Sequence, residues 1–309
     1  MKNARIKIEK NSKLKGMNLE AADLSNADLS GRNLDHSNLK SAMLKSVNLE
    51  EATLVGSNLQ DANLSDSHLA SVDFSEANLA SANLENSYLY CANFTRANMP
   101  RANLRKSNLW YGGGEFINLE LADFTESSPV EGHWHFSNFK NANFTKSNWS
   151  STIISYSDLE GGNFDSARLD GTVFVSSNLK RCSFTNAWLG AYFENCDLRG
   201  CDFSNVKDHD SSQIQIDDDT DIFGPNFDHA DLTSVNFKNA VIRNSSFRNA
   251  TLFETNFENC DLSGSDFTDA KIEKVNFKGS VLTNSTIEMA NLGTSDLSGA
   301  TLPKNTEGN

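Results

Sequence analysis

The sequence predicts an all-β solenoid, a chain that winds around its own core in stacked coils. Three observations predict this fold. One class of large apolar residue returns every five positions, a small residue lies two positions before each, and phenylalanines recur 20 residues apart. Neither an α-helix nor a flat strand has a period of five. A repeat of this kind outweighs length as a guide to domain number.

The five-residue period begins at Leu14 and continues through Leu19 and Leu24 to Leu109. Small residues such as Ala22 and Ala42 lie two positions before these large ones. On an extended chain, residues two apart point to the same side, so both face inward. Asn, Asp, Ser and Gly fill the remaining positions and are the residues that favour turns. The pattern predicts a core enclosed by short sides that meet at polar corners.

The aromatic residues indicate the length of one coil. Phenylalanines recur every 20 residues in three sets, which are Phe124, Phe144, Phe164 and Phe184; Phe227, Phe247 and Phe267; and Phe237, Phe257 and Phe277. Like residues would stack on like if four pentapeptides made one coil. The sequence then predicts roughly 13 coils of 20 residues, with phenylalanine on two opposite walls.

Three irregularities interrupt the period. Gly114, Pro129 and Trp134 occupy large inward positions, so we expect loops or distorted corners in an irregular segment 110–135. The spacing falls to four between Leu189 and Phe193, a one-residue deletion that predicts a local kink. It rises to 24 between Phe203 and Phe227, which predicts an inserted acidic loop at 204–226.

These boundaries divide the chain into five segments, which are an amino-terminal cap (1–13), the main β-helix (14–203), the inserted loop (204–226), carboxy-terminal coils (227–302) and a tail (303–309). Residues 4–10 alternate apolar and charged side chains, as a capping strand would. No capping helix follows the last repeat. We therefore expect the last coil to be covered by a second copy, as a homodimer through the carboxy-terminal coil.

Runs such as ADLSNADLS, SANLENSYLYCANFTRANM and CDLRGCDF resemble the pentapeptide-repeat family, whose signature is A(D/N)Lxx. The resemblance covers nearly the whole chain and implies a right-handed quadrilateral β-helix. Fold alone does not fix function. The best-known members imply one candidate partner, since they mimic DNA and occupy the DNA-binding surface of gyrase or topoisomerase IV, which protects these enzymes from quinolones.

Charge separates the possible partners. The formal net charge of −14 argues against direct nucleic-acid binding, because phosphate contacts require a basic surface. The acidic excess is concentrated in segments 110–135 and 204–226, each with a net charge of −5. A DNA mimic needs charge along its walls, so this distribution favours a protein partner that meets the interruptions. No apolar run approaches the roughly 18 residues of a membrane span, and the amino terminus has no signal-peptide pattern, so we expect a cytoplasmic protein.

The candidate partner-binding residues lie in the two acidic segments. Trp110, Tyr111 and Trp134 could form an exposed aromatic anchor, or equally could cap distorted coils. The second group is acidic and comprises Asp208, Asp210, Asp217, Asp218, Asp219 and Asp221. Its spacing lacks the alternation and central glycine of a calcium loop, so we expect a solvated loop. His133 and His135 flank Trp134 without a third metal ligand, and loop packing is the simpler interpretation.

Nothing in the sequence indicates catalysis, a cofactor or a metal. Cys182, Cys196, Cys201 and Cys260 occupy small inward positions, where burial makes a thiol inert, and only Cys91 is expected to face outward. Arg32 also falls at an inward position and is expected to reach out at a corner. The sequence thus predicts a non-enzymatic interaction scaffold, with DNA mimicry toward a type II topoisomerase as the alternative.

Overall fold

The computed structural model describes residues 12–194, 196–206, 225–288 and 292–303. The chain divides into two compact units, Met1–Gly162 and Asn163–Asn309. Both are all-β in their described parts, which contain no α-helix. Within the same ranges no helix could span a membrane.

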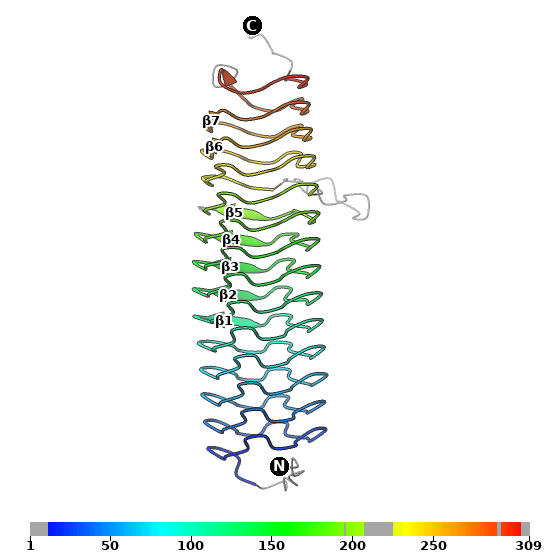
Figure 1. Cartoon of the computed structure of the whole chain (residues 1–309), viewed down its shortest axis with the longest axis vertical. Helices are drawn as coiled ribbons and strands as arrows, with labels where there is room; N and C mark the ends of the chain where they lie inside the picture. Colours follow the sequence, from blue (N-terminus) through cyan, green and yellow to red (C-terminus); the bar gives the residue numbers. More distant parts are fainter. Residues whose placement is uncertain (1–11, 195, 207–224, 289–291, 304–309) are drawn as a thin grey trace, which may run out of the picture. The chain divides into compact units, whose positions relative to one another are not determined.

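In the first unit, each coil pairs in parallel with the next, and every pairing step has the same length along the chain, from Asn18 with Asn38 to Asn138 with Asp158. Three strands stand out in this ladder: β1 (Gly113–Glu115), β2 (His133–His135) and β3 (Ile153–Ser155). Figure 1 shows them one above another along one wall. The expected coil of four pentapeptides is therefore confirmed in this unit.

Most corners of the first unit are four-residue turns closed by a backbone hydrogen bond. The Ala22 amide, for example, donates to the Leu19 carbonyl at 3.1 Å, and Ala21 between them has a φ of 53°. A positive φ at the third residue of such a turn is the conformation of type II turns. Most corners carry Asn, Asp, Ser, Glu or Gly at this position.

The interior follows the predicted pattern. Leu19, Leu24 and the later members of their column are buried, and so are most of the small residues two positions earlier. Arg32 is half-buried, and its guanidinium donates to the Ser12 carbonyl. Arg32 therefore has a hydrogen-bond partner and is not a buried, unpaired charge. The predicted capping strand at 4–10 lies outside the described residues.

A ladder of asparagine side chains runs along one wall of the first unit. The Nδ2 group of each donates to the Oδ1 atom of the asparagine one coil earlier, at 2.9–3.3 Å. Its members are Asn18, Asn38, Asn58, Asn78, Asn98, Asn118 and Asn138. Most of the same Oδ1 atoms also accept the backbone amide two positions later, as Asn78 does from Ala80 at 3.3 Å. One asparagine side chain therefore links two neighbouring coils and also stabilises the turn that follows it.

The expectation of loops or distorted corners in segment 110–135 is wrong. The regular pairing continues through it, and Gly114 and Trp134 lie opposite one another in β1 and β2. The error arose because glycine, proline and tryptophan were judged unfit for the inward column. Gly114 has no side chain, which leaves room in the core for the large side chain of Trp134 one coil later.

The second unit contains β4 (Val173–Val175), β5 (Tyr192–Glu194), β6 (Thr251–Phe253) and β7 (Lys271–Glu273), drawn in Figure 1. β4 pairs with β5 so that Val173 lies opposite Tyr192, a step one position shorter than a regular coil, which confirms the deletion. Tyr192 then pairs with Asn226, a much longer step along the chain, which confirms an insertion. Beyond it the regular offset returns, as between Thr251 and Lys271.

Two columns of stacked phenylalanine rings form the core of the second unit. Neighbouring rings within a column have centroids 4.4–5.4 Å apart. One column contains Phe164, Phe184, Phe203, Phe237, Phe257 and Phe277, and the other Phe174, Phe193, Phe227, Phe247 and Phe267. The stacking predicted from the phenylalanine spacing is confirmed, and it persists across the deletion and the insertion.

The predicted number of coils, roughly 13, is not supported. The described residues contain seven short strands, so regular strands mark only about seven turns. Elsewhere in the described ranges, neighbouring segments are joined through single-residue bridges and not through extended strands. A solenoid with tight corners leaves few residues per side in extended conformation, so regular strands are short and infrequent.

Candidate functional site

The predicted aromatic anchor is present only in part. Trp110 and Tyr111 are exposed, with 41% and 46% of their surface accessible, but Trp134 is 1% accessible. Trp134 points into the core and contacts Phe94, Phe139 and Trp149, so it cannot touch a partner. Its removal from the proposed anchor is a correction. The six aspartates from Asp208 to Asp221 lie outside the described residues.

Two further tyrosines join Trp110 and Tyr111 at one edge of a wall. Tyr88 stacks on Tyr90, with ring centroids 6.1 Å apart, and Tyr90 meets Tyr111 edge to face at 5.5 Å. The hydrogen bond from the Tyr111 hydroxyl to Glu131, with the charge of that carboxylate, raises the pKa of Tyr111. We call Tyr88, Tyr90, Trp110 and Tyr111 the tyrosine cluster.

The opposite edge of the same wall carries a second aromatic group, which the sequence analysis missed. Phe116, Phe136 and Tyr156 are stacked, with centroids 5.2 and 5.1 Å apart, yet they are 52%, 47% and 57% accessible. The guanidinium of Arg96 lies 6.0 Å from the Phe116 centroid. We call these three rings the aromatic ladder. They lie one coil apart in the sequence, at positions outside the inward column.

The aromatic ladder is costly to the fold. Phe116, Phe136 and Tyr156 all sit at corners with φ between 51° and 58°, where bulky residues are disfavoured and Gly or Asn is preferred. Ring stacking recovers about 0.5–1.5 kcal/mol per pair. Smaller polar residues form the same turn at other corners, so the fold itself does not require aromatic rings here.

A shallow hollow of about 380 Å³ lies on the wall between the two aromatic edges. Its floor is the backbone of Gly112, Gly113 and Gly114, where three consecutive residues lack side chains. Tyr111, Glu115, His133 and His135 line it together with Cys91, Ala92, Asn93 and Thr95. The wall thus presents a recess with one tyrosine, one carboxylate and two imidazoles around it.

The two histidines do not form a metal site with their neighbours. Their ring centroids are 6.0 Å apart, and the described residues contain no group of three or more His, Cys, Asp or Glu side chains that could hold a metal ion. His135 Nδ1 is 2.5 Å from Ser155 Oγ. Burial, and to a lesser degree the neighbouring His133, lower the pKa of His135.

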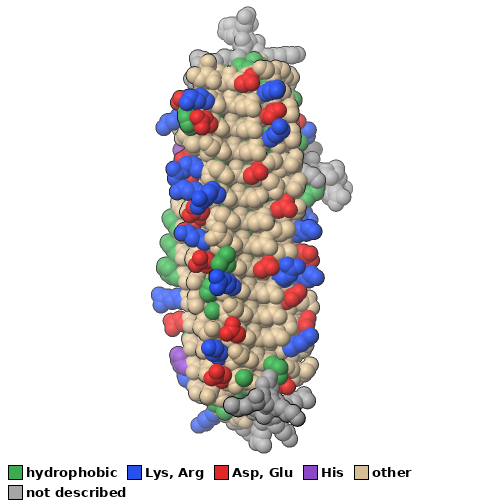
Figure 2. All heavy atoms as spheres, viewed as in Figure 1, with side chains coloured by type: hydrophobic (Ala, Val, Ile, Leu, Met, Phe, Trp, Pro, Cys, Tyr) green, Lys and Arg blue, Asp and Glu red, His purple; other side chains and the backbone are tan. Residues whose placement is uncertain are grey.

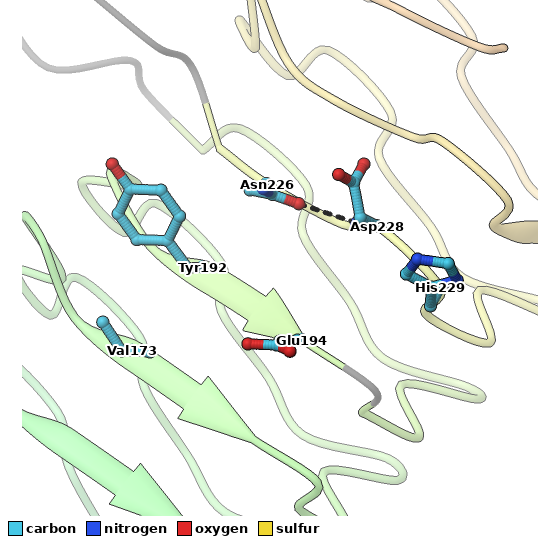
Figure 3. Close-up of a pocket in the computed structure, with 6 residues that line it drawn as sticks. All are labelled: Val173, Tyr192, Glu194, Asn226, Asp228 and His229. Carbon is cyan, nitrogen blue, oxygen red and sulfur yellow. Dashed lines mark hydrogen bonds between the residues drawn. The ribbon is translucent and has the colours of Figure 1, made fainter.

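A second hollow, of about 420 Å³, lies in the second unit (Figure 3). Val173 of β4, Tyr192 and Glu194 of β5, and Asn226, Asp228 and His229 line it. The Asn226 side chain accepts the Asp228 amide at 2.8 Å, and Asp228 itself accepts from Ser246 and Arg248. Since Asp228 is already engaged and Tyr192 is the only Phe, Tyr or Trp among the described residues that line this hollow, it is the weaker candidate.

The cysteines are placed as the sequence predicts. Cys91 is exposed and the other four are buried. Burial raises the pKa of both Cys196 and Cys260 to about 12, so these thiols stay protonated near neutral pH.

Models of pentapeptide repeats match the sequence of this chain over residues 10–110 and 135–171. A model of the pentapeptide repeat region matches residues 220–297. The chain belongs to the pentapeptide-repeat family. A search of curated proteins gave no match to this pentapeptide-repeat protein.

Solved structures resemble the protein only distantly. QnrB1, a plasmid-mediated fluoroquinolone resistance protein, is 17% identical with a TM-score of 0.39, covering 66% of this chain and 92% of its own. HetL, a pentapeptide repeat protein involved in the regulation of heterocyst differentiation in the cyanobacterium Nostoc sp. strain PCC 7120, is 19% identical with a TM-score of 0.22, covering 84% of this chain and 89% of its own. A mannuronic acid specific polysaccharide family 6 lyase from human gut microbiota is 10% identical with a TM-score of 0.33, covering 88% and 82%.

Proposed function

We propose that this pentapeptide-repeat protein is a non-enzymatic binding scaffold, whose partner protein docks on the wall between the tyrosine cluster and the aromatic ladder. The observation that carries the proposal is the aromatic ladder itself. Exposed Phe and Tyr are the residue types enriched at protein interfaces. Here they occupy corners where the backbone conformation disfavours them, so their presence points to a contact outside the fold.

The amount and kind of surface support a protein partner. The two aromatic edges flank a recess, so a partner could bury rings on both sides and insert a side chain between them. Aromatic anchors around a desolvated pocket are typical of the central part of an interface. Figure 2 shows one face of the molecule, on which backbone and side chains of other types predominate and charged side chains are scattered.

Site-directed photocrosslinking tests this proposal directly. Phe136 is replaced by p-benzoylphenylalanine in the cells that produce the protein, and the crosslinked partner is identified by mass spectrometry. The matched control carries the same substitution at Leu121, an exposed corner residue outside both aromatic groups. We expect a discrete adduct from position 136 that is lost when Phe116 and Tyr156 are also changed to serine. Equal adducts from both positions would contradict the proposal.

The second candidate function is DNA mimicry toward gyrase or topoisomerase IV, with protection from quinolone-type inhibitors. The net charge of −14 favours it. On the face shown in Figure 2, however, acidic and basic side chains of the described residues are interspersed and form no continuous acidic stripe. A titration of gyrase supercoiling, with and without a fluoroquinolone, tests this candidate. Inhibition or rescue at micromolar protein would support it, and no effect at large excess would reject it.

Three further proposals concern the whole molecule. We infer a right-handed quadrilateral winding, a cytoplasmic location, and a homodimer through the carboxy-terminal coil. The dimer is the most directly testable, because a solenoid end leaves backbone donors and acceptors available for pairing. Light scattering of the full chain should give twice the mass of one chain, and a monomer mass at micromolar concentration would reject it.

A further inference from the structure

We propose that the hollow above Gly113 receives an arginine or lysine side chain, and that the partner of the aromatic wall is an extended basic segment of another protein. This inference rests on the proposed function and adds the chemistry of the partner. It follows from three properties of the wall: its charge, its shape and the arrangement of its aromatic rings.

Charge is the first property. Residues 110–135 contain five acidic residues and neither lysine nor arginine. Two of the five belong to the recess: Glu115 lines it, and Glu131 is hydrogen-bonded to the lining residue Tyr111. Arg96, one coil earlier, lies over the Phe116 ring and is 4.0 Å from Glu76, so a carboxylate outside the recess offsets its charge. The recess is therefore complementary to a cation.

Shape is the second property. Gly113 faces outward, opposite His133 of the next coil, and Gly112 and Gly114 flank it in the floor. The wall therefore recedes to its backbone at Gly113, and the recess has a volume of about 380 Å³. A Cβ atom at Gly113 would lie 2.0 Å from the His133 carbonyl oxygen, so this floor can only be glycine. The recess is thus fixed by the coil packing and does not need to open before a ligand enters.

The aromatic edges are the third property. Tyr111 stands at one side of the recess and Phe116 at the other, at successive corners of the same coil. The face of an aromatic ring attracts guanidinium and ammonium groups. A carboxylate beside the ring attracts the same cations through its negative charge. Alternate side chains of an extended segment point the same way. A basic residue in the recess would therefore be flanked by apolar neighbours that reach the two aromatic edges.

The alternative occupants fit less well. A second copy of the chain would bring Glu115 and Glu131 of the recess against the same two carboxylates, which is repulsive. A free metal ion lacks ligands, because no group of three suitable side chains exists among the described residues. An acidic or neutral segment would leave Glu115 and Glu131 without a counter-charge in the interface, which is unfavourable once water is excluded.

Fluorescence anisotropy with labelled short peptides tests the inference on the full-length protein. The probe alternates arginine and leucine, and the matched controls replace arginine by glutamate or by its neutral isostere citrulline. We expect the arginine peptide to bind and the citrulline peptide to bind at least fivefold more weakly. The double variant Glu115→Gln, Glu131→Gln should weaken binding of the arginine peptide about five- to tenfold, as expected for two exposed charge pairs.

A matched charge control separates the recess from the overall negative charge. Glu126→Gln removes an exposed carboxylate of the same segment that does not line the hollow, and it should change the affinity less than twofold. Circular dichroism melting curves should coincide for all variants, since the substituted side chains are exposed. An equal loss in Glu126→Gln and in the double variant would show a general charge effect and overturn the inference.

The remaining outcomes distinguish the two proposals. If citrulline and arginine peptides bind equally, and serine at positions 116, 136 and 156 abolishes both, the wall binds proteins but the cation is not recognised. If no peptide binds at millimolar concentration while the crosslink from position 136 persists, this inference is wrong and the proposed function stands.

Discussion

Trp134 contacts Phe94 across the position of Gly114. The two ring centroids are 6.2 Å apart and nearly parallel, although two pairing steps separate the residues, Asn93 with Gly113 and Gly113 with His133. Two strand spacings are about 9.6 Å, so the indole must lean into the space that the missing side chain leaves. The same glycine that makes room for the core tryptophan also lies in the floor of the recess outside.

Trp134→Ala should destabilise the first unit by about 3–5 kcal/mol, because it removes a large buried ring and leaves a cavity. Urea unfolding followed by circular dichroism measures the loss. Trp134→Phe is the control. Since the indole Nε1 has no hydrogen-bond partner, phenylalanine loses only part of the packing, and the loss should be clearly smaller. Equal losses would show that ring size is unimportant there.

Gly114→Ala should cost about 1–3 kcal/mol through backbone strain. Gly114 has a φ of 144°, and a Cβ atom there would lie 2.7 Å from both the amide nitrogen and Oγ1 of Thr95. Gly31→Ala is the matched control, because its φ of 63° is shared with non-glycine corners and no atom lies within 4 Å. Its loss should stay below about 1 kcal/mol. Urea unfolding of both variants decides between them.

Asn78→Asp should destabilise the first unit by about 1–2 kcal/mol. The Asn78 amide donates to Asn58 Oδ1 at 3.2 Å and accepts from Asn98 Nδ2 at 3.1 Å. A carboxylate keeps the acceptor but places two oxygens against one another at the lost donor. Thermal unfolding should show the loss, while Asn26→Asp at an exposed corner should leave the melting temperature nearly unchanged. A neutral effect at position 78 would mean that water satisfies the ladder equally well.

One thiol per chain should react rapidly with a disulfide reagent in the native protein, and Cys91→Ser should abolish that reaction. Cys91 is the exposed cysteine, whereas the four others are buried. Burial raises the pKa of Cys196 and Cys260 to about 12, so the reactive thiolate form is scarce at neutral pH. All five should react after denaturation. A second fast thiol in native protein would reveal opening of the core.

Binding of the arginine peptide should weaken as the pH falls and His135 in the recess becomes protonated. The groups around His135 are His133, Glu115, Tyr111 with Glu131, and Ser155. Burial lowers the pKa of His135 from 6.5, so it is neutral at pH 7, and protonation on acidification adds a charge that repels the cation. His135→Gln should flatten this part of the profile, measured by the same anisotropy assay.

The same shift has a consequence for folding. Because the pKa of His135 is lower in the folded chain than in the unfolded chain, protonation favours unfolding. Its contribution to stability is complete above the ordinary pKa of 6.5 and is lost as the pH falls below it. His135→Gln should remove this slope from the urea midpoint between neutral and mildly acidic pH, and an unchanged slope would assign it to other groups.

Residue spacing was enough to predict most of the interior. Leu19 and Phe227 are buried because a five-residue period leaves two positions per side facing the core, and the shortened and lengthened pairing steps of the second unit follow from counting. Segment 110–135 was misjudged because Gly114 and Trp134 each break the pattern alone and satisfy it only together. Trp134 fills the space that Gly114 leaves in the preceding coil. The residue pattern within one coil carries no information about such contacts between coils.

The candidate site was only partly visible for a related reason. Trp110 and Tyr111 were named because they stand beside the glycines, but Trp134 was grouped with them by sequence proximity and lies inside. Phe116, Phe136 and Tyr156 share a corner because each lies one coil after the last, and their stacking at the surface required the geometry of successive corners. The recess itself is an absence of side chains between two such corners.

The unequal pairing steps in the second unit bear on how such a chain can evolve. Ring stacking continues from Phe184 to Phe203 and from Phe203 to Phe237, although the first step is shorter than a regular coil and the second is much longer. A corner can therefore lose a residue or gain many without displacing the column, since loop closure costs little additional entropy as the loop lengthens. Mutations that change chain length at corners are thus nearly neutral for the core, and selection can vary what a corner displays while the scaffold is inherited unchanged.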